Sequence, residues 1–380
     1  MRYYTKNLLF VVIVFFCGCA GYKPPAPSPL VNFKPTLNVQ QQWSMRASQG
    51  TSGEYLKLTP AIVDNKVFVN SYVGEITAVD ANSGHKIWKT YTKMNLTSGL
   101  AAGNGMLFIG NSEGQVLAYQ QSNGAFVWWA PLSSQVLATP GVNENVLLVK
   151  AENGQLSAFN INNAKQLWVY SHDEPTLILR GGSSPQVFGN KVVTGFASGE
   201  LVVIDLHDGQ FIWREPIAEG QGSMAVQRMV NIDVNPKIFN GIIYVATYQG
   251  KIAAVNLKSG KILWQHKLSS YSGLAVDNER VYVSDEEGHV WAFDRETGDV
   301  IWKQNDLSYR KITGPALVSN AIVVGDGQGY LHFMSPADGH FIARVLVHKN
   351  DGIIVEPITA GNSVFVYTQG GRLARFDVDG

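Results

Sequence analysis

Residues 74–88 read GEITAVDANSGHKIW, and variants of this segment recur along the whole chain. Residues 250–264 read GKIAAVNLKSGKILW, and residues 288–302 read GHVWAFDRETGDVIW. The eight copies begin at Gly74, Gly114, Gly154, Gly199, Gly250, Gly288, Gly329 and Gly371. A unit that recurs about every 40 residues is typical of propellers and solenoids. The fold therefore follows from the structure of one copy.

Each copy carries the signals of a β-hairpin. Apolar residues alternate or run continuously after the opening glycine, as they do in a strand buried within a stack of sheets. A turn follows, in which an Asp or Asn caps its own backbone and a glycine such as Gly84 or Gly260 supplies a positive φ. The predicted caps are Asp80, Asp205, Asn256 and Asp294. A second strand then ends the copy.

Apolar runs between the copies, such as residues 67–69 and 242–245, supply two more strands. Four strands in about 40 residues make one blade of a β-propeller. The sequence thus predicts an all-β protein, an eight-bladed β-propeller.

The ends of the chain predict how this ring closes. The eighth copy stops at Gly380, before its outer strand. Residues 39–45, VQQQWSM, resemble that missing strand, and we predict that they pair into the last blade. Closure removes exposed strand edges, which would otherwise favour aggregation. The predicted propeller spans residues 37–380.

Tryptophan recurs at one fixed place in the second strand of the copies. These residues are Trp88, Trp128, Trp168, Trp213, Trp264 and Trp302. Because large aromatic side chains at a fixed register bury much apolar surface, we interpret them as packing between blades and not as an aromatic ligand site. The seventh copy has Ala343 instead, so its packing contact must be made differently.

The start of the chain has the pattern of an export signal. A basic beginning precedes an apolar run, residues 8–16, that is shorter than the roughly 20 residues of a membrane span. The Gly-Cys pair that follows resembles a bacterial lipobox, which implies removal of residues 1–18 and lipidation of Cys19. Cys17 is a competing acceptor, and an ordinary signal peptide is the alternative interpretation.

Residues 19–36 are predicted to form a proline-rich tether, with GYKPPAPSP at residues 21–29. This composition is extended and semi-rigid. Ala20 follows the cysteine, in place of the Asp that usually retains lipoproteins on the inner membrane. The lipobox resemblance therefore implies a lipid-anchored protein of the outer membrane that faces the periplasm.

Composition excludes several classes of function. Lys and Arg together number 30, as do Asp and Glu, so the balance of charge gives no general reason to bind nucleic acid. Both cysteines lie in the export segment, which leaves the folded part without a disulfide, a thiolate metal site or a cysteine nucleophile. The histidines are scattered without metal-ligand spacing.

The repeat pattern A-x-D-x-x-x-G-x-x-x-W resembles that of the pyrroloquinoline quinone (PQQ) propellers. It is clearest at Ala78, Asp80, Gly84 and Trp88, and at Ala292, Asp294, Gly298 and Trp302. That group includes quinone-dependent alcohol dehydrogenases, which hold the quinone against two adjacent disulfide-linked cysteines and a Ca²⁺ ion. The folded part has no cysteine, and the acidic residues 285–287 are interpreted as a solvated turn. We therefore expect no enzyme, no cofactor and no metal.

The non-catalytic branch, the BamB family of outer-membrane lipoproteins, fits the rest of the chain. The spacing between copies widens to 45 residues before Gly199 and to 51 before Gly250, which places extra residues in loops on one face. Residues 175–182, PTLILRGG, resemble the family segment that docks the central subunit of the barrel-assembly machinery. The resemblance makes Leu177, Leu179 and Arg180 partner-binding residues.

Residues 228–236, RMVNIDVNP, resemble the adjacent family loop, in which two acidic residues alternate. Here the first is Asn231, and only Asp233 stays acidic. We predict that Asp233 orients Arg180 through a charge-assisted hydrogen bond. The alternative is that residues 177–179 form a buried innermost strand that ends at Arg180.

The resemblance implies a non-catalytic scaffold that binds the periplasmic (POTRA) domains of BamA, the barrel-inserting subunit, and presents nascent outer-membrane proteins to it. One alternative is a PQQ-dependent dehydrogenase-like or cofactor-binding propeller, against which the missing cysteines argue. Another is a propeller scaffold of a different envelope complex, against which only the two partner loops argue.

Overall fold

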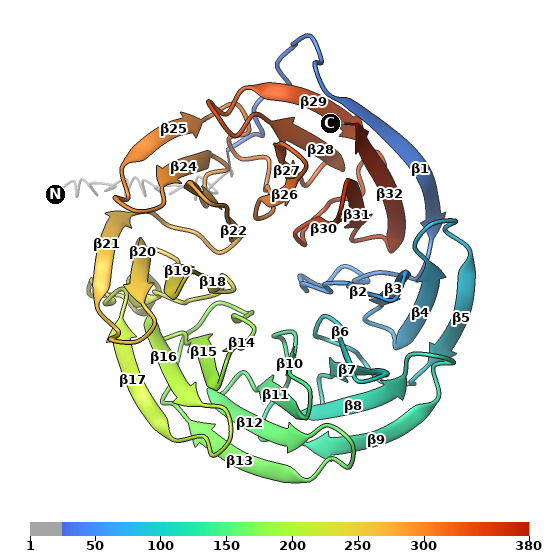
Figure 1. Cartoon of the computed structure of the whole chain (residues 1–380), viewed down its shortest axis with the longest axis vertical. Helices are drawn as coiled ribbons and strands as arrows, with labels where there is room; N and C mark the ends of the chain where they lie inside the picture. The colour runs from blue at the N-terminus through green and yellow to red at the C-terminus, as the bar shows by residue number, and fades with distance from the viewer. Residues whose placement is uncertain (1–24, 380) are drawn as a thin grey trace, which may run out of the picture.

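The computed structural model describes residues 25–379, which form a closed ring of eight four-stranded antiparallel sheets (Figure 1). Each sheet is one blade, and its strands follow in chain order from the axis outward, except in the last blade. The predicted eight-bladed β-propeller is confirmed.

The strands of blades one to four are β2 (Ala61–Val63), β3 (Lys66–Asn70), β4 (Glu75–Asp80), β5 (Lys86–Tyr91), β6 (Ala101–Gly103), β7 (Met106–Gly110), β8 (Gln115–Gln120), β9 (Phe126–Pro131), β10 (Gly141–Val142), β11 (Val146–Lys150), β12 (Gln155–Asn160), β13 (Gln166–Ser171), β14 (Gln186–Phe188), β15 (Lys191–Gly195), β16 (Glu200–Asp205) and β17 (Phe211–Pro216). The remaining elements are the 3₁₀ turn η1 (Ala225–Arg228), β18 (Lys237–Phe239), β19 (Ile242–Ala246), β20 (Lys251–Asn256), β21 (Ile262–Lys267), β22 (Gly273–Val276), β23 (Arg280–Ser284), β24 (Val290–Asp294), β25 (Val300–Gln304), β26 (Ala316–Val318), β27 (Ala321–Gly325), β28 (Tyr330–Met334), β29 (Phe341–Leu346), β30 (Ile358–Ala360), β31 (Ser363–Tyr367), β32 (Arg372–Asp379) and β1 (Asn38–Arg46).

The quoted repeat forms the hairpin of the third and fourth strands in each blade. In blade one, Asp80 Oδ1 accepts the backbone N–H groups of Asn82 and Ser83 at 3.1 and 2.8 Å. Gly84 follows with φ +71°, the left-handed conformation that favours glycine. The predicted caps and positive-φ glycines are therefore confirmed.

The recurring tryptophans join each blade to the next. Their indole Nε1–H groups donate to a backbone carbonyl of the following blade at 2.8 to 3.1 Å. The indole rings of Trp43, Trp88, Trp168, Trp213, Trp264 and Trp302 also cover the turn glycine of that blade. The predicted packing between blades is confirmed, and each contact combines apolar burial with a satisfied donor.

The ring closes through β1, which pairs antiparallel with β32 from Asn38↔Asp379 to Arg46↔Arg372 (Figure 1). Trp43 of β1 then packs on Gly84 of blade one, as the other tryptophans do. The predicted closing strand is confirmed. Because the outer strand of blade eight is β1, no hairpin turn joins its third and fourth strands, and none is there to receive a tryptophan from blade seven. Ala343 occupies that place, buried in a cluster against which Leu37 and Val39 pack.

Residues 28–36, part of the predicted tether, lie against blades six and seven. We call this segment the N-terminal strap. Thr36 N–H donates to Ile342 O at 2.9 Å, and Ser28 N–H donates to Ser308 O at 2.9 Å. The predicted signal peptide and Cys19 lie outside the described residues. No helix within residues 25–379 is long and apolar enough to cross a membrane.

Candidate functional site: a loop surface around the axial cavity

The two long loops predicted to bind a partner lie on the same face of the ring. Residues 172–185 connect β13 to β14, and residues 217–236 connect β17 to β18. Both loops join the outer strand of one blade to the inner strand of the next, so both cross from the rim toward the axis. They meet beside a cavity of about 560 Å³ that opens on this face.

Leu177 and Leu179 lie in an irregular loop, and residues 177–179 form no strand. The alternative that these residues are a buried inner strand is therefore wrong. Leu177 is 45% exposed, whereas Leu179 is half-buried and lines the cavity. An exposed leucine beside a cavity rim is an apolar anchor of the kind that contributes strongly to protein interfaces.

Asn231 holds this loop in place from below. Its side chain is buried, and its Nδ2 donates to the carbonyl oxygen of Leu179 at 3.4 Å. The backbone carbonyl oxygen of Asn231 accepts the N–H of Tyr248 at 2.8 Å. A buried amide with these contacts positions the Leu179 backbone and is not itself exposed to a partner.

Arg180 does not pair with Asp233, so the predicted bond between them is wrong. Its Nη1 lies 2.6 Å from Glu54 Oε2, and both side chains are about two-fifths exposed. Glu54 belongs to the loop between β1 and β2, which crosses the same face from blade eight to blade one. The guanidinium is thus directed across the cavity mouth by a residue that the sequence did not indicate.

Asp233 is 8% exposed and lines the cavity, with no hydrogen bond or ion pair to another residue of the described chain. Burial raises the pKa of its carboxyl to about 6, and the ammonium groups of Lys57 and Lys150 oppose that rise. Asp233 therefore supplies negative charge inside the cavity wall, near the buried Lys150 and the half-buried Lys57.

Lys150 links the first partner loop, residues 172–185, to the blade beneath it. Its Nζ donates to Gly195 O at 2.6 Å and lies 3.3 Å from the Ser183 hydroxyl. Burial lowers the pKa of this ammonium to about 8, opposed by the carboxylates of Glu174 and Asp233. No sequence signal marks Lys150, because it ends an ordinary strand and only the fold brings it beneath residues 181–182.

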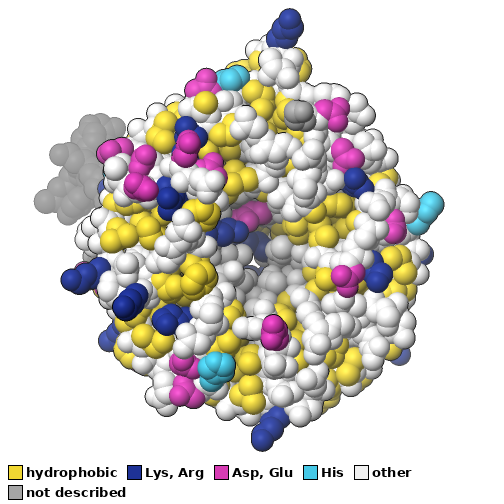
Figure 2. Space-filling view, in the orientation of Figure 1, with side chains coloured by type: hydrophobic (Ala, Val, Ile, Leu, Met, Phe, Trp, Pro, Cys, Tyr) yellow, Lys and Arg dark blue, Asp and Glu magenta, His cyan; other side chains and the backbone are white. Residues whose placement is uncertain are grey.

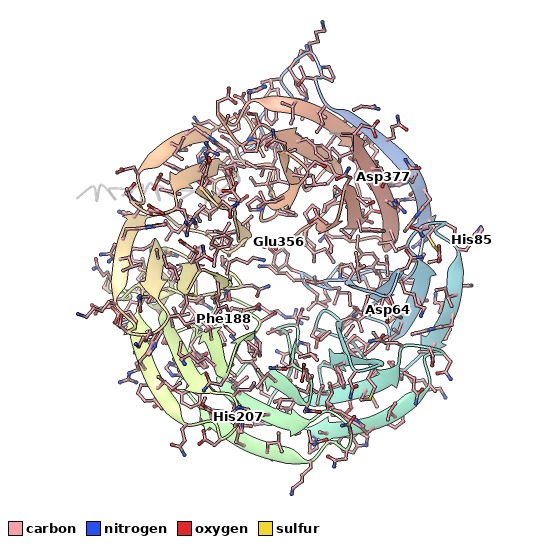
Figure 3. All side chains as sticks on the ribbon, in the orientation of Figure 1. Asp64, His85, Phe188, His207, Glu356 and Asp377 are labelled. Atoms are coloured by element: carbon pink, nitrogen blue, oxygen red, sulfur yellow. The ribbon has the colours of Figure 1, made fainter. Side chains whose placement is uncertain are left out.

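The axial cavity is walled by the loops that join successive blades. Figure 2 shows the hollow at the centre of the ring, with basic and acidic side chains in its wall. Glu356 points toward the axis from the loop before β30 (Figure 3), and Lys57 Nζ donates to Tyr271 O at 2.5 Å. Three tyrosines, Tyr55, Tyr248 and Tyr271, complete the aromatic part of the wall.

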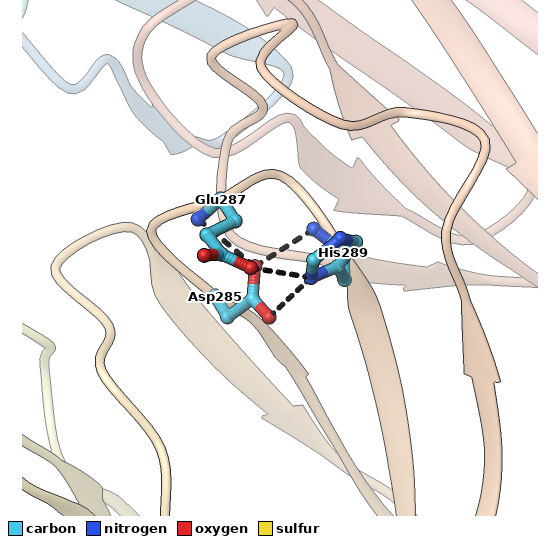
Figure 4. A group of neighbouring side chains, drawn as sticks. All are labelled: Asp285, Glu287 and His289. Carbon is cyan, nitrogen blue, oxygen red and sulfur yellow. Dashed lines mark hydrogen bonds and ion pairs between the residues drawn. The ribbon is translucent and has the colours of Figure 1, made fainter. Parts of the chain in front are cut away.

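A second polar group lies at the turn between β23 and β24 (Figure 4). Atoms of Asp285, Glu287 and His289 that could bind a metal lie within 4.8 Å of one another, which the sequence analysis did not predict. Asp285 Oδ1 accepts the N–H groups of both other residues, and its Oδ2 faces His289 Nδ1 at 2.7 Å and accepts Trp291 Nε1–H. The carboxylate is thus already engaged as a turn cap.

Comparison with known proteins decides between the alternatives left by the sequence. The family model for the outer membrane protein assembly factor BamB matches residues 72–304. The outer membrane protein assembly factor BamB of Pseudomonas aeruginosa is 39% identical over 98% of this chain and 97% of that protein. The chain belongs to the BamB family. The BamB protein of Escherichia coli is 31% identical and covers 95% of each chain.

Solved structures agree with this fold. The crystal structure of BamB from Moraxella catarrhalis aligns with a TM-score of 0.82 at 24% identity, covering 90% of this chain and 100% of that one. A quinohemoprotein alcohol dehydrogenase from Comamonas testosteroni aligns with a TM-score of 0.69 at 13% identity, over 89% of this chain and 76% of the enzyme, and shows only the shared propeller. Membership of the BamB family makes this chain a non-catalytic propeller of outer-membrane protein assembly, not a quinone enzyme.

Proposed function

We propose that this BamB-family propeller binds the periplasmic POTRA domains of BamA through the loop surface around Leu177, Leu179 and Arg180, and so helps to present nascent outer-membrane proteins to that subunit. The observation that carries the proposal is one loop that exposes Leu177 and places Leu179 and the Arg180 guanidinium in the wall of the cavity. Each is fixed from behind, Leu179 by Asn231 and Arg180 by Glu54. Pre-positioned apolar and Arg anchors lower the entropy lost on binding.

The proposal assigns different roles to the five predicted residues. Leu177 and Arg180 contact the partner directly, and Leu179 does so through its cavity-facing side. Asn231 positions the loop, and Asp233 sets the charge of the cavity wall. The proposal also includes removal of residues 1–18, lipidation of Cys19 and a periplasmic location beneath the outer membrane, with the residues from Cys19 to the docked N-terminal strap connecting lipid and propeller.

The test is a titration of purified BamA POTRA domains with the propeller and three variants. Leu177→Ala and Arg180→Ala are each expected to weaken binding at least tenfold, the loss of roughly 1.4 kcal/mol or more that marks an interface anchor. The matched control is Leu263→Ala, because Leu263 is 50% exposed but lies on the outer strand of blade five. Equal affinity of all four proteins would place the interface elsewhere, and no binding by any of them would contradict BamA as the partner.

A further inference from the structure

The N-terminal strap is bound by the propeller in a receptor built for it. Arg310 Nη1 donates to Ser28 O and Arg344 Nη1 donates to Val31 O, each at 2.9 Å. The ring of Phe33 lies 5.6 Å from that of Phe341, and the Arg344 guanidinium stacks over Phe33 at 4.9 Å. Backbone hydrogen bonds, charge and aromatic packing therefore hold the strap along its whole length.

The two arginines are themselves held by buried groups of blade seven. Asp326 is fully buried and accepts Arg310 Nε–H at 2.8 Å. Its Oδ2 lies 2.9 Å from His332 Nε2, and Arg344 Nε–H donates to His332 Nδ1 at 3.1 Å. This pattern requires a neutral His332 that carries its proton on Nε2, in agreement with the burial that lowers its pKa.

These contacts leave the Nη1 group of each arginine directed at the strap. Buried charges are costly unless they are paired, and packing between blades does not need them, since the other blades pack through tryptophan and glycine. The network therefore acts as a preformed receptor for the backbone carbonyl groups of the strap.

Docking of the strap shortens the distance that a lipid anchor could span. A free chain from residue 19 to residue 36 would reach about 60 Å, whereas nine residues from Cys19 to Ser28 reach about 30 Å at full extension. A compact domain with as many residues as this propeller is about 50 Å across. A free tether would thus let the propeller turn any side to the membrane, and the docked strap would not.

The strap leaves the propeller at a defined place. Ser28 lies beside Ser308, in the connection between β25 and β26, on the face that carries the inter-blade loops. The partner loops lie on the same face, with residues 217–236 two blade positions and residues 172–185 three blade positions round the ring (Figure 1).

We propose that the docked strap fixes the orientation of the propeller on the membrane, with the rim of blades six and seven next to the lipid surface and the partner loops of blades three to five turned away from it. This inference rests on the proposed lipidation of Cys19. The strap is then a positioning element of the fold and not a flexible spacer.

A matched pair of labels tests the orientation. Glu113 and Glu287 occupy the same place in their repeats, are exposed, and lie on blades two and six, opposite each other in the ring. Single variants Glu113→Cys and Glu287→Cys of the full lipoprotein would carry a fluorescent donor in vesicles of phosphatidylethanolamine and phosphatidylglycerol with an acceptor on the headgroups. Energy transfer is expected to be stronger from position 287. Equal transfer from both positions would overturn the proposal.

Strap variants give the second comparison. The double variant Val31→Ala, Phe33→Ala alters only the strap and leaves the blades intact. The variant Arg344→Gln weakens the receptor instead. The control is Asn32→Ala, at an exposed position of the strap. The double strap variant and Arg344→Gln are expected to remove the difference in energy transfer between positions 287 and 113. They should also abolish the slow hydrogen exchange expected for the Thr36 and Leu37 amides, whereas the control variant should keep the difference and the slow exchange. Loss of slow exchange with unchanged transfer would overturn the orienting role.

Failure of the anchor is recognised separately. If the full protein does not associate with vesicles and carries no lipid by mass spectrometry, the proposed lipidation falls and the orientation inference falls with it. Binding of the POTRA domains is measured without vesicles, so that result distinguishes failure of the anchor from failure of the partner site.

Discussion

The turn glycines show how one residue satisfies two constraints. Gly84 has φ +71°, and a Cβ built on it would lie 2.6 Å from the indole ring of Trp43. Gly105 has nearly the same backbone, with φ +73°, but open space where a Cβ would lie. The first glycine is therefore required by conformation and by packing between blades, and the second by conformation alone.

Gly84→Ala is expected to cost about 2–4 kcal/mol, because the left-handed conformation costs an alanine about 1–2 kcal/mol and overpacking against the indole adds about 1–3 kcal/mol. Gly105→Ala should cost only the first part, about 1–2 kcal/mol. Urea unfolding of both variants measures the difference. Equal losses would show that the indole moves aside without cost.

The buried carboxyl of Asp233 predicts a dependence of stability on pH. Its pKa rises from 3.8 to about 6 in the folded protein. The contribution of Asp233 to the free energy of unfolding is therefore complete below the pKa that its carboxyl has in the unfolded chain. It is lost as the pH rises through about 6. The wild-type protein should lose up to about 3 kcal/mol relative to Asp233→Asn between pH 4 and pH 7.

The measurement is the free energy of unfolding of both proteins at several pH values in that range. Lys150 stays protonated throughout it, because its pKa is about 8, so the change in slope reports on Asp233. Parallel curves for the two proteins would contradict the raised pKa.

Among the elements, β1 carries the closure of the ring. It supplies the fourth strand of blade eight and covers the edge of β32. It also brings Trp43 and Met45 into the cluster shared by blades eight and one. The strap that precedes β1 touches blades six and seven instead.

A chain that begins at Ser48 should therefore lose the closed ring, expose the β32 edge and self-associate. A chain that begins at Asn38 lacks the strap but keeps β1, and should stay monomeric with a modestly lower melting temperature. Size-exclusion chromatography and thermal unfolding compare the two. A monomeric, stable protein that begins at Ser48 would show that β1 is dispensable for closure.

At the scale of the whole molecule, the shared propeller architecture does not fix the function. A quinohemoprotein alcohol dehydrogenase shares this propeller at only 13% sequence identity. Here the axis is an open cavity lined by three tyrosines, by the opposite charges of Lys57 and Asp233, and by Glu356. The folded part has no cysteine that could form the quinone-contacting disulfide.

Added PQQ with Ca²⁺ is accordingly expected to leave the melting temperature of this protein unchanged, because only a ligand that binds the folded state raises it. A quinone-dependent alcohol dehydrogenase stripped of its cofactor is the positive control. A concentration-dependent rise in the melting temperature would show that the axial cavity binds the quinone.

The repeat pattern alone predicted the blades, the capped turns, the tryptophan contacts and the closing strand. Those features depend on local periodicity, and each copy repeats the same short-range signals, such as Asp80 followed by Gly84. The sequence also located the loop that bears Leu177 and Arg180, through its extra length and its resemblance to a known family.

Only the tertiary structure decided which groups meet across the ring. It paired Arg180 with Glu54 instead of Asp233, placed Lys150 beneath the partner loop, and docked the strap on Arg310 and Arg344. These contacts join segments that are tens to hundreds of residues apart and have no shared period. Their partners are set by how eight blades close into a ring, which brings every inter-blade loop to one cavity.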